Sequence, residues 1–261
     1  MIGILGAGSM GSAIACSLSK AGRSVAVYDP DPARSRLVRE GSPSVLIAQN
    51  EKSLITDTDI VIIAVKPQGI EPVLKQIGIS ADPEKIIVSI AAGITTGYIE
   101  RHLPFKAKVI RTMPNLAVKT ERSVTALCRG VNSRESDLDR AVEIFDVLGA
   151  TLRVDECDMD KITAVSGSGP GYIFYFLETF VKSVAKLGFT SEQAHKLVFN
   201  TFMGTASIAR DGGEFSNYCA QVCSKGGTTE AGISAFADAR LDNIFDDVLN
   251  RAVARASELG K

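Results

Sequence analysis

Three glycines near the start of the chain have the spacing of a dinucleotide-binding turn. Gly6, Gly8 and Gly11 form the pattern G-x-G-x-x-G, which follows a short apolar stretch and opens a run with helical periodicity. In this strand-turn-helix context the glycines let the backbone approach a pyrophosphate, and free N–H groups at the helix N-terminus point toward the phosphates. We therefore predict that this segment, with Ser9 and Met10, binds NADH or NADPH.

The choice between these two cofactors depends on residues about twenty positions further on. Asp29 ends a second apolar stretch, where a carboxylate accepts hydrogen bonds from the adenosine ribose and repels a 2′-phosphate, which favours NADH. Arg34 and Arg36 follow closely and could bind that phosphate, although they are equally well explained as solvated helix charges. The sequence leaves the cofactor as NADPH or NADH.

Three further segments lie where apolar stretches end. They are Ala64-Val-Lys-Pro67, Ala91-Ala-Gly93 and Met113-Pro-Asn115. Dinucleotides lie across the carboxyl ends of parallel strands, so small and turn-forming residues there are candidates for contact with the ribose and nicotinamide. Each segment alone is explained as well by a simple turn. The cofactor-binding candidates among them are Ala64, Val65, Lys66, Pro67, Ala91, Ala92 and Asn115.

Two Gly-containing motifs in the second half of the chain suit a helix junction and the binding of a small carboxylate. Ser166-Gly-Ser-Gly-Pro170 is expected to end one helix and start another, with Pro170 in a first turn. Ser224-Lys-Gly-Gly-Thr-Thr229 leads into a helix and concentrates N–H and O–H donors at its N-terminus, which suits a small carboxylate. A helix cap combined with a hinge is the alternative explanation.

The elements that position these motifs follow from apolar periodicity. Strand and helix patterns alternate over residues 1–154, which predicts an α/β domain, a Rossmann-type doubly wound sheet that is mostly parallel and covered on both faces. Residues 155–261 show long amphipathic runs and no convincing strand, so an all-helical domain is expected. Strands are predicted at 24–29, 45–48, 59–65, 86–90, 109–112, 124–128 and 151–154, besides the one before Gly6. Helices are predicted after the Gly-rich turn, from Asp31-Pro32, and at 68–77, 96–103, 134–148, 172–187, 191–210, 229–239 and 241–259.

One predicted helix is apolar most of the way round. Tyr172-Ile-Phe-Tyr-Phe-Leu177 has no polar side of any width, so burial on more than one side is expected, and a second subunit would supply it.

Composition excludes several classes of function. The net charge is −1 and no cluster of basic residues occurs, so nucleic acid is not an expected partner. The sequence shows no long apolar run and no secretion signal, which predicts a cytoplasmic protein without a membrane segment. The five cysteines are scattered and only two histidines occur, so we expect reduced cysteines and no metal site.

In the order and content of these motifs the chain resembles the pyrroline-5-carboxylate reductase family. The resemblance rests most on the pairing of Ser166-Gly-Ser-Gly-Pro170 with Ser224-Lys-Gly-Gly-Thr-Thr229. It implies NAD(P)H-dependent reduction of 1-pyrroline-5-carboxylate to L-proline, the last step of proline biosynthesis, by a homodimer with interlocked helical domains, often assembled into larger rings. It also implies that Thr229 bonds the ring nitrogen, that Ser224, Gly226, Gly227 and Thr228 hold the substrate carboxylate, and that Asn50 lies near the adenosine ribose.

Two departures from the family pattern stand out. Leu116-Ala117 follows Met113-Pro-Asn115 where the family commonly has Thr-Pro, and Asp29 stands where the family often has a polar uncharged or basic residue that suits NADPH.

Two other functions fit the N-terminal motif. A β-hydroxyacid dehydrogenase would need a catalytic Lys soon after the second Gly-rich segment, but residues 171–181 contain none and Lys182 comes too late. A non-catalytic dinucleotide sensor would bind the cofactor without turnover and would have no use for a carboxylate-binding loop.

Overall fold

The computed structural model describes residues 1–209 and 212–259, and these form two compact units. The first contains Met1–Pro170 together with the chain from Ala252 onward, and the second contains Gly171–Arg251. The predicted domain boundary between residues 154 and 155 separates the strands from the long helices. The two compact units of the structure instead meet in the sequence after Pro170. The boundary at 154 and 155 stays a prediction.

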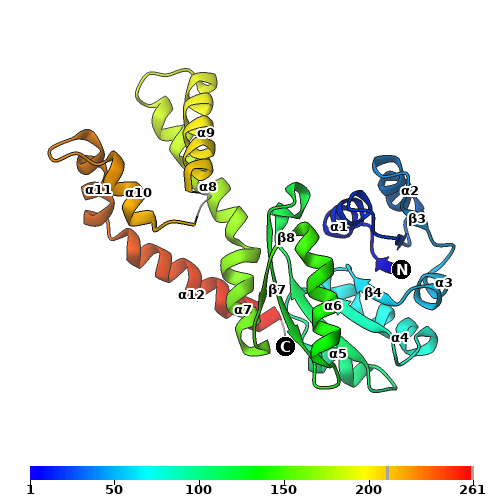
Figure 1. The fold of residues 1–261 in the computed structure, drawn as a ribbon. Coiled ribbons are helices and arrows are strands. Elements are labelled where there is room, and N and C mark those ends of the chain that lie inside the picture. Colours follow the sequence, from blue (N-terminus) through cyan, green and yellow to red (C-terminus); the bar gives the residue numbers. More distant parts are fainter. Residues whose placement is uncertain (210–211, 260–261) are drawn as a thin grey trace. The chain divides into compact units, whose positions relative to one another are not determined.

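The first unit is built on one eight-stranded sheet (Figure 1). The strand order is β3-β2-β1-β4-β5-β6-β7-β8, and only the β6–β7 pair is antiparallel. Because β1 lies between β2 and β4, the sheet reverses direction of growth at β1, which is where doubly wound sheets bind ligands. The bounds are β1 (Ile2–Leu5), β2 (Val25–Tyr28), β3 (Leu46–Ile47), β4 (Ile60–Ile63), β5 (Ile86–Ser89), β6 (Lys108–Met113), β7 (Ser123–Arg129) and β8 (Gly149–Arg153).

Helices cover both faces of this sheet, as the sequence predicts. Alternate residues of one strand enter different cores: Ile4 packs with Ile14 of α1, and Leu5 packs with Leu54 of α3. The helices α1 (Ser9–Lys20), α2 (Pro32–Gly41) and α6 (Glu135–Phe145) contribute to the first core. The helices α3 (Glu51–Asp57), α4 (Ile70–Ser80) and α5 (Thr96–His102) contribute to the second.

The connection out of this unit differs from the expected break. The helix α7 (Met159–Ile162), a π-helical turn (Thr163–Gly167) and α8 (Gly169–Ala185) follow one another with only a bend at Ser168. A Cβ at Gly167 would lie 2.4 Å from Met113 Cε. The glycine therefore lets the wide turn pass the end of β6, and the expected interruption is replaced by a π-bulge. Pro170 lies in the first turn of α8, which confirms that part of the prediction.

The described residues of the second unit form helices joined by loops, and no strand occurs among them. The unit contains α8, α9 (Ser191–Ile208), α10 (Phe215–Val222), α11 (Thr228–Asp238) and the first part of α12 (Leu241–Leu259). The sequence missed α10. The predicted end of α9 at Arg210 lies outside the described residues.

The tightest approach in the first unit occurs at Gly11, which gives a stability prediction. A Cβ there would lie 2.0 Å from the carbonyl oxygen of Gly6, a backbone atom that cannot move aside. We expect Gly11→Ala to lower the free energy of unfolding by about 2 kcal/mol or more, measured by urea denaturation. Gly41→Ala is the matched control, because its Cβ would meet only Cys16 Sγ at 4.0 Å. Equal effects of both changes would contradict this packing.

Candidate dinucleotide and carboxylate sites

The Gly-rich turn is fixed by the strands beneath it. Gly6 has φ +105° and its N–H donates to Tyr28 O at 2.8 Å, while a Cβ on Gly6 would lie 2.7 Å from Ala64 O. Gly6 is thus pressed between the ends of β2 and β4, where only glycine fits. A Cβ built on Gly8 meets nothing within 4 Å, so Gly8 faces open space just before α1 begins.

The Asp29 carboxylate braces this turn through hydrogen bonds with backbone N–H groups. The side chain is only 7% exposed, and Asp29 Oδ2 accepts the Ala7 N–H at 2.8 Å while Oδ1 accepts the Asp31 N–H at 2.9 Å. The Arg34 guanidinium lies 3.8 Å from the same carboxylate. The sequence identified Asp29 as a ribose ligand but missed this bracing role, because the contact with Ala7 depends on the sheet. Ribose binding by Asp29 stays a prediction.

A cavity of about 710 Å³ opens beside the turn. Its lining combines one face of α1, one face of α2 and two lysines: Ala7, Gly8, Ser9, Ser12, Ala13, Cys16, Ser17, Arg34, Leu37, Val38, Lys66 and Lys119. The cationic side chains are Arg34, Lys66 and Lys119, and no acidic residue of the described ranges belongs to the lining. A cavity of this size and charge suits a polyanionic ligand.

The structure separates the two arginines that the sequence left equivalent. Arg34 lines the cavity, whereas Arg36 Nε donates to Pro32 O at 3.3 Å within α2 and Arg36 is absent from the lining. Lys119, near the end of a 3-10 helix (Leu116–Thr120), was missed because its place beside α1 comes from long-range packing. Burial raises the pKa of the Cys16 thiol, so the cavity meets a neutral thiol there.

The other cofactor candidates are distributed along one sheet edge. Ala64, Ala91 and Asn115 follow β4, β5 and β6, three neighbouring parallel strands whose carboxyl ends share that edge. Val65, Lys66, Pro67 and Ala92 belong to the same loops. Asn50 instead caps α3, with Asn50 Oδ1 accepting the Ser53 N–H at 2.8 Å. Binding of a cofactor by these residues stays a prediction.

Asn115 joins two motifs that are far apart in the sequence. Its Oδ1 accepts the Ala117 N–H at 3.0 Å, and its Nδ2 donates to Ser166 Oγ at 3.1 Å. The side-chain amide is therefore held from both ends, and the Met113–Asn115 turn lies against the start of the Ser166–Pro170 motif.

The second motif of the helical unit forms a compact turn at the start of α11. Gly226 has φ +73°, and the Gly227 N–H donates to Ser224 O at 2.9 Å. The Gly226 N–H donates to Glu230 Oε2 at 2.5 Å, so a carboxylate of the chain already occupies one of the donors expected to bind substrate. Thr228 and Thr229 are the first two residues of α11. Glu230 was missed because the sequence shows only that it lies in the first turn of a helix.

The described part of the chain lacks two kinds of structure. None of its helices combines the length and apolar character needed to cross a bilayer. Nor does it gather three or more His, Cys, Asp or Glu side chains in a way that could hold a metal ion.

Comparison with known proteins places these features in one family. A sequence profile described as pyrroline-5-carboxylate reductase dimerisation matches residues 156–259, and one described as NADP oxidoreductase coenzyme F420-dependent matches residues 1–93. The pyrroline-5-carboxylate reductase of Methanosarcina acetivorans is 32% identical over 100% of this chain and 98% of its own. The chain belongs to the pyrroline-5-carboxylate reductase family.

Solved structures of this family agree with the assignment. The pyrroline-5-carboxylate reductase of Coxiella burnetii superposes with a TM-score of 0.92 at 30% identity, covering 100% of this chain and 98% of that one. The Plasmodium falciparum enzyme, solved with NADP bound, gives a TM-score of 0.85 with the same coverage, and at 24% identity it supports the fold alone. The predicted fold class and family are thereby confirmed.

The lining of the cavity predicts how cofactor choice responds to mutation. If Arg34 binds the 2′-phosphate, Arg34→Ala should weaken NADPH binding by about tenfold and NADH binding much less, because only NADPH loses a charged hydrogen bond. Arg36→Ala is the control and should leave both affinities unchanged. Cofactor affinities can be measured by fluorescence titration. Equal weakening of NADPH and NADH by Arg34→Ala would remove Arg34 from phosphate recognition.

Proposed function

We propose that the protein is an NAD(P)H-dependent reductase that converts 1-pyrroline-5-carboxylate to L-proline. The observation that carries the proposal is similarity over the whole chain to pyrroline-5-carboxylate reductases, in a molecule that has both a cationic cavity at a Gly-rich turn and a donor-rich loop at the start of α11. The first feature suits a dinucleotide and the second suits a small carboxylate.

The residues of the first unit fit a dinucleotide. Gly8 leaves open space for close approach, and Lys66 and Arg34 add positive charge. We assign cofactor binding to the residues proposed from the sequence: Gly6, Gly8, Ser9, Met10, Gly11, Asp29, Asn50, Ala64, Val65, Lys66, Pro67, Ala91, Ala92 and Asn115. When bound, NADH or NADPH supplies the hydride for the reduction.

The loop before α11 is assigned to the substrate. Ser224, Gly226, Gly227 and Thr228 hold the carboxylate, and Thr229 hydrogen-bonds the ring nitrogen. A cyclic imine is partly protonated near neutral pH, so its carbon is already electrophilic and the protein mainly has to position it. A strong general acid is therefore not needed, which agrees with the lack of a histidine in either motif.

The β-hydroxyacid dehydrogenase alternative requires a catalytic lysine that this chain lacks at the expected place. Lys182 is engaged by Glu178 at 2.6 Å one turn earlier in α8, and residues 171–181 supply no lysine. The sensor alternative leaves the loop before α11 without a purpose. Both alternatives are therefore disfavoured.

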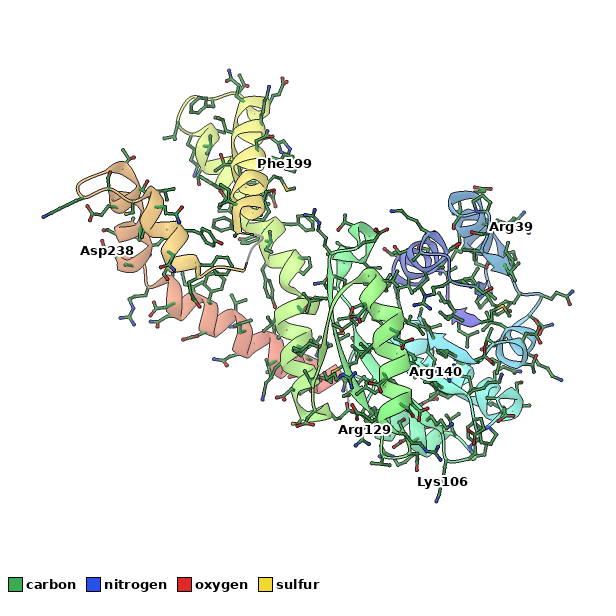
Figure 2. All side chains as sticks on the ribbon, in the orientation of Figure 1. Arg39, Lys106, Arg129, Arg140, Phe199 and Asp238 are labelled. Atoms are coloured by element: carbon green, nitrogen blue, oxygen red, sulfur yellow. The ribbon has the colours of Figure 1, made fainter. Side chains whose placement is uncertain are left out.

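The helical unit supports a homodimer, as the matched dimerisation profile indicates. Phe174 and Tyr175 of α8 are 62% and 73% exposed in the single chain, and Phe199 of α9 (Figure 2) lines an apolar cavity of about 500 Å³ between the two helices. Apolar surface of this kind marks an interface. Assembly of dimers into a larger ring and a cytoplasmic location stay predictions.

Initial rates of cofactor oxidation test the activity. With 1-pyrroline-5-carboxylate the protein should oxidise NADPH or NADH and form L-proline, whereas 3-hydroxyisobutyrate with NAD⁺ or NADP⁺ should give no reduction of the cofactor. Oxidation of neither cofactor would defeat the proposal. Cofactor binding without any turnover would favour the sensor, and turnover of the hydroxyacid would favour the dehydrogenase.

The position of Glu230 gives a sharper prediction about the substrate loop. In Glu230→Gln the amide oxygen can still accept the Gly226 N–H, but the negative charge next to the incoming carboxylate is removed. We expect KM for 1-pyrroline-5-carboxylate to fall by about fivefold at unchanged kcat. With 1-pyrroline, the same ring without the carboxylate, KM should not change. An equal change for both substrates, or none for either, would contradict carboxylate binding at this loop.

A further inference from the structure

One charged residue lies inside the loop assigned to the substrate carboxylate. Residues 224–229 join α10 to α11 (Figure 1), and Lys225 is the only charged residue among them. The Lys225 side chain is exposed, and no acidic side chain of the described residues lies within ion-pair distance of it. Its ammonium group is therefore available to pair with a bound anion.

The backbone around Lys225 forms a tight turn. The Gly227 N–H donates to Ser224 O at 2.9 Å, which makes residues 224–227 a β-turn closed by a hydrogen bond. Gly226, the third residue of the turn, has φ +73°, whereas Lys225, the second, is not among the described residues with positive φ. This combination is that of a type II turn.

The turn itself does not require a lysine. Proline suits the second position of a type II turn, because its ring fixes φ near the value that this position needs. The Lys225 N–H donates no hydrogen bond to a described residue, so proline would remove none. Turn geometry therefore does not account for the lysine, and its charge is the property left to explain.

The groups next to Lys225 give that charge a use. The Gly226 N–H donates to Glu230 Oε2 at 2.5 Å, so one negative charge already lies against the turn. A substrate carboxylate that binds the remaining donors of the loop would be repelled by Glu230. An ammonium group on the neighbouring residue offsets this repulsion, and its hydrogen bond to a carboxylate is charge-assisted.

We propose that Lys225 binds the substrate carboxylate and makes the enzyme selective for cyclic imines that carry an acid group. The inference rests on the proposed reductase function. It adds to the N–H and O–H donors of the loop a residue whose contribution depends on charge. A cyclic imine without a carboxylate gains nothing from Lys225.

Initial rates with two cyclic imines test the proposal. Lys225→Gln should raise KM for 1-pyrroline-5-carboxylate by about fivefold to tenfold at unchanged kcat, because one charge-assisted hydrogen bond to the substrate is lost. KM for 1-pyrroline should not change, and Lys225→Arg, which keeps the charge, should stay close to the parent protein. Equal KM values for 1-pyrroline-5-carboxylate in the parent and in Lys225→Gln would overturn the proposal.

Lys225→Pro separates the charge from the shape of the turn. Proline fits the turn and restricts the unfolded chain, so the urea midpoint should be equal to that of the parent or higher. KM for 1-pyrroline-5-carboxylate should nevertheless rise as it does in Lys225→Gln. A Lys225→Pro protein with the parent KM would show that the charge is not used, which would overturn the proposal.

Lys186→Gln is the matched control. Lys186 is an exposed residue of the same unit that follows α8, outside the loop. The variant removes one positive charge, as Lys225→Gln does, and should leave KM for 1-pyrroline-5-carboxylate at the parent value. An equal rise of KM in both variants would indicate a general effect of net charge and would overturn the assignment to Lys225.

Product binding distinguishes failure of this proposal from failure of the proposed function. An active parent whose KM is unchanged in Lys225→Gln defeats this proposal alone, whereas a parent that oxidises neither cofactor defeats the proposed function. In the second case, calorimetric titration with L-proline decides about Lys225. Lys225→Gln should bind L-proline about fivefold to tenfold more weakly than the parent does. Equal affinities, or no binding of L-proline by the parent, would overturn the proposal.

Discussion

The dinucleotide unit depends on the absence of side chains where the Gly-rich turn crosses the sheet. Gly6 lies against the carbonyl of Ala64, and Gly11 lies against the carbonyl of Gly6, so that β1, β4 and α1 meet with no room for a Cβ. Because of this close approach, α1 begins directly above the strand ends and its free N–H groups border the cavity. The cationic side chains can line a cavity, and Asp29 can accept the Ala7 N–H, only because the turn is held in this position.

Charge is arranged differently at the two candidate sites. Around the turn, the carboxylate of Asp29 is used by two backbone N–H groups, and Arg34, Lys66 and Lys119 leave the cavity cationic. At the start of α11, the carboxylate of Glu230 lies on a donor proposed for the substrate. An acidic side chain near a ligand site can thus serve to hold the backbone of that site. Its effect on a bound anion depends on whether it occupies N–H donors that the anion would otherwise use.

Much of this fold can be predicted from the sequence, because apolar alternation and glycine spacing are local signals. The strands around Ile4, Ile62 and Ile87 are buried at every residue and are recognisable as continuous apolar runs, and the cap at Asp31 is local chemistry. The π-bulge could not be predicted, because it depends on Met113 packing against Gly167 from another element. Gly and Pro residues predict an interruption of the helix whether the chain forms a π-bulge or a true break between two helices.

The candidate site residues also differ in whether they can be recognised from local sequence. The Gly-rich turn and the loop before α11 are recognisable as short motifs, whereas Lys119 reaches the cavity lining only through the packing of its 3-10 helix against α1. Likewise, α10 was missed because eight residues give too little periodicity to identify a short helix. The family assignment, which uses the whole chain, supplies what single motifs could not.

The proposed reductase activity requires that the cofactor bound at the Gly-rich turn gives its hydride directly to 1-pyrroline-5-carboxylate. Isotope transfer tests it most directly, using NADPH or NADH carrying deuterium at both C4 positions, incubated with the protein and 1-pyrroline-5-carboxylate. The expected product is L-proline with one deuterium on the former imine carbon. Proline without deuterium, or cofactor oxidation without proline, would contradict it.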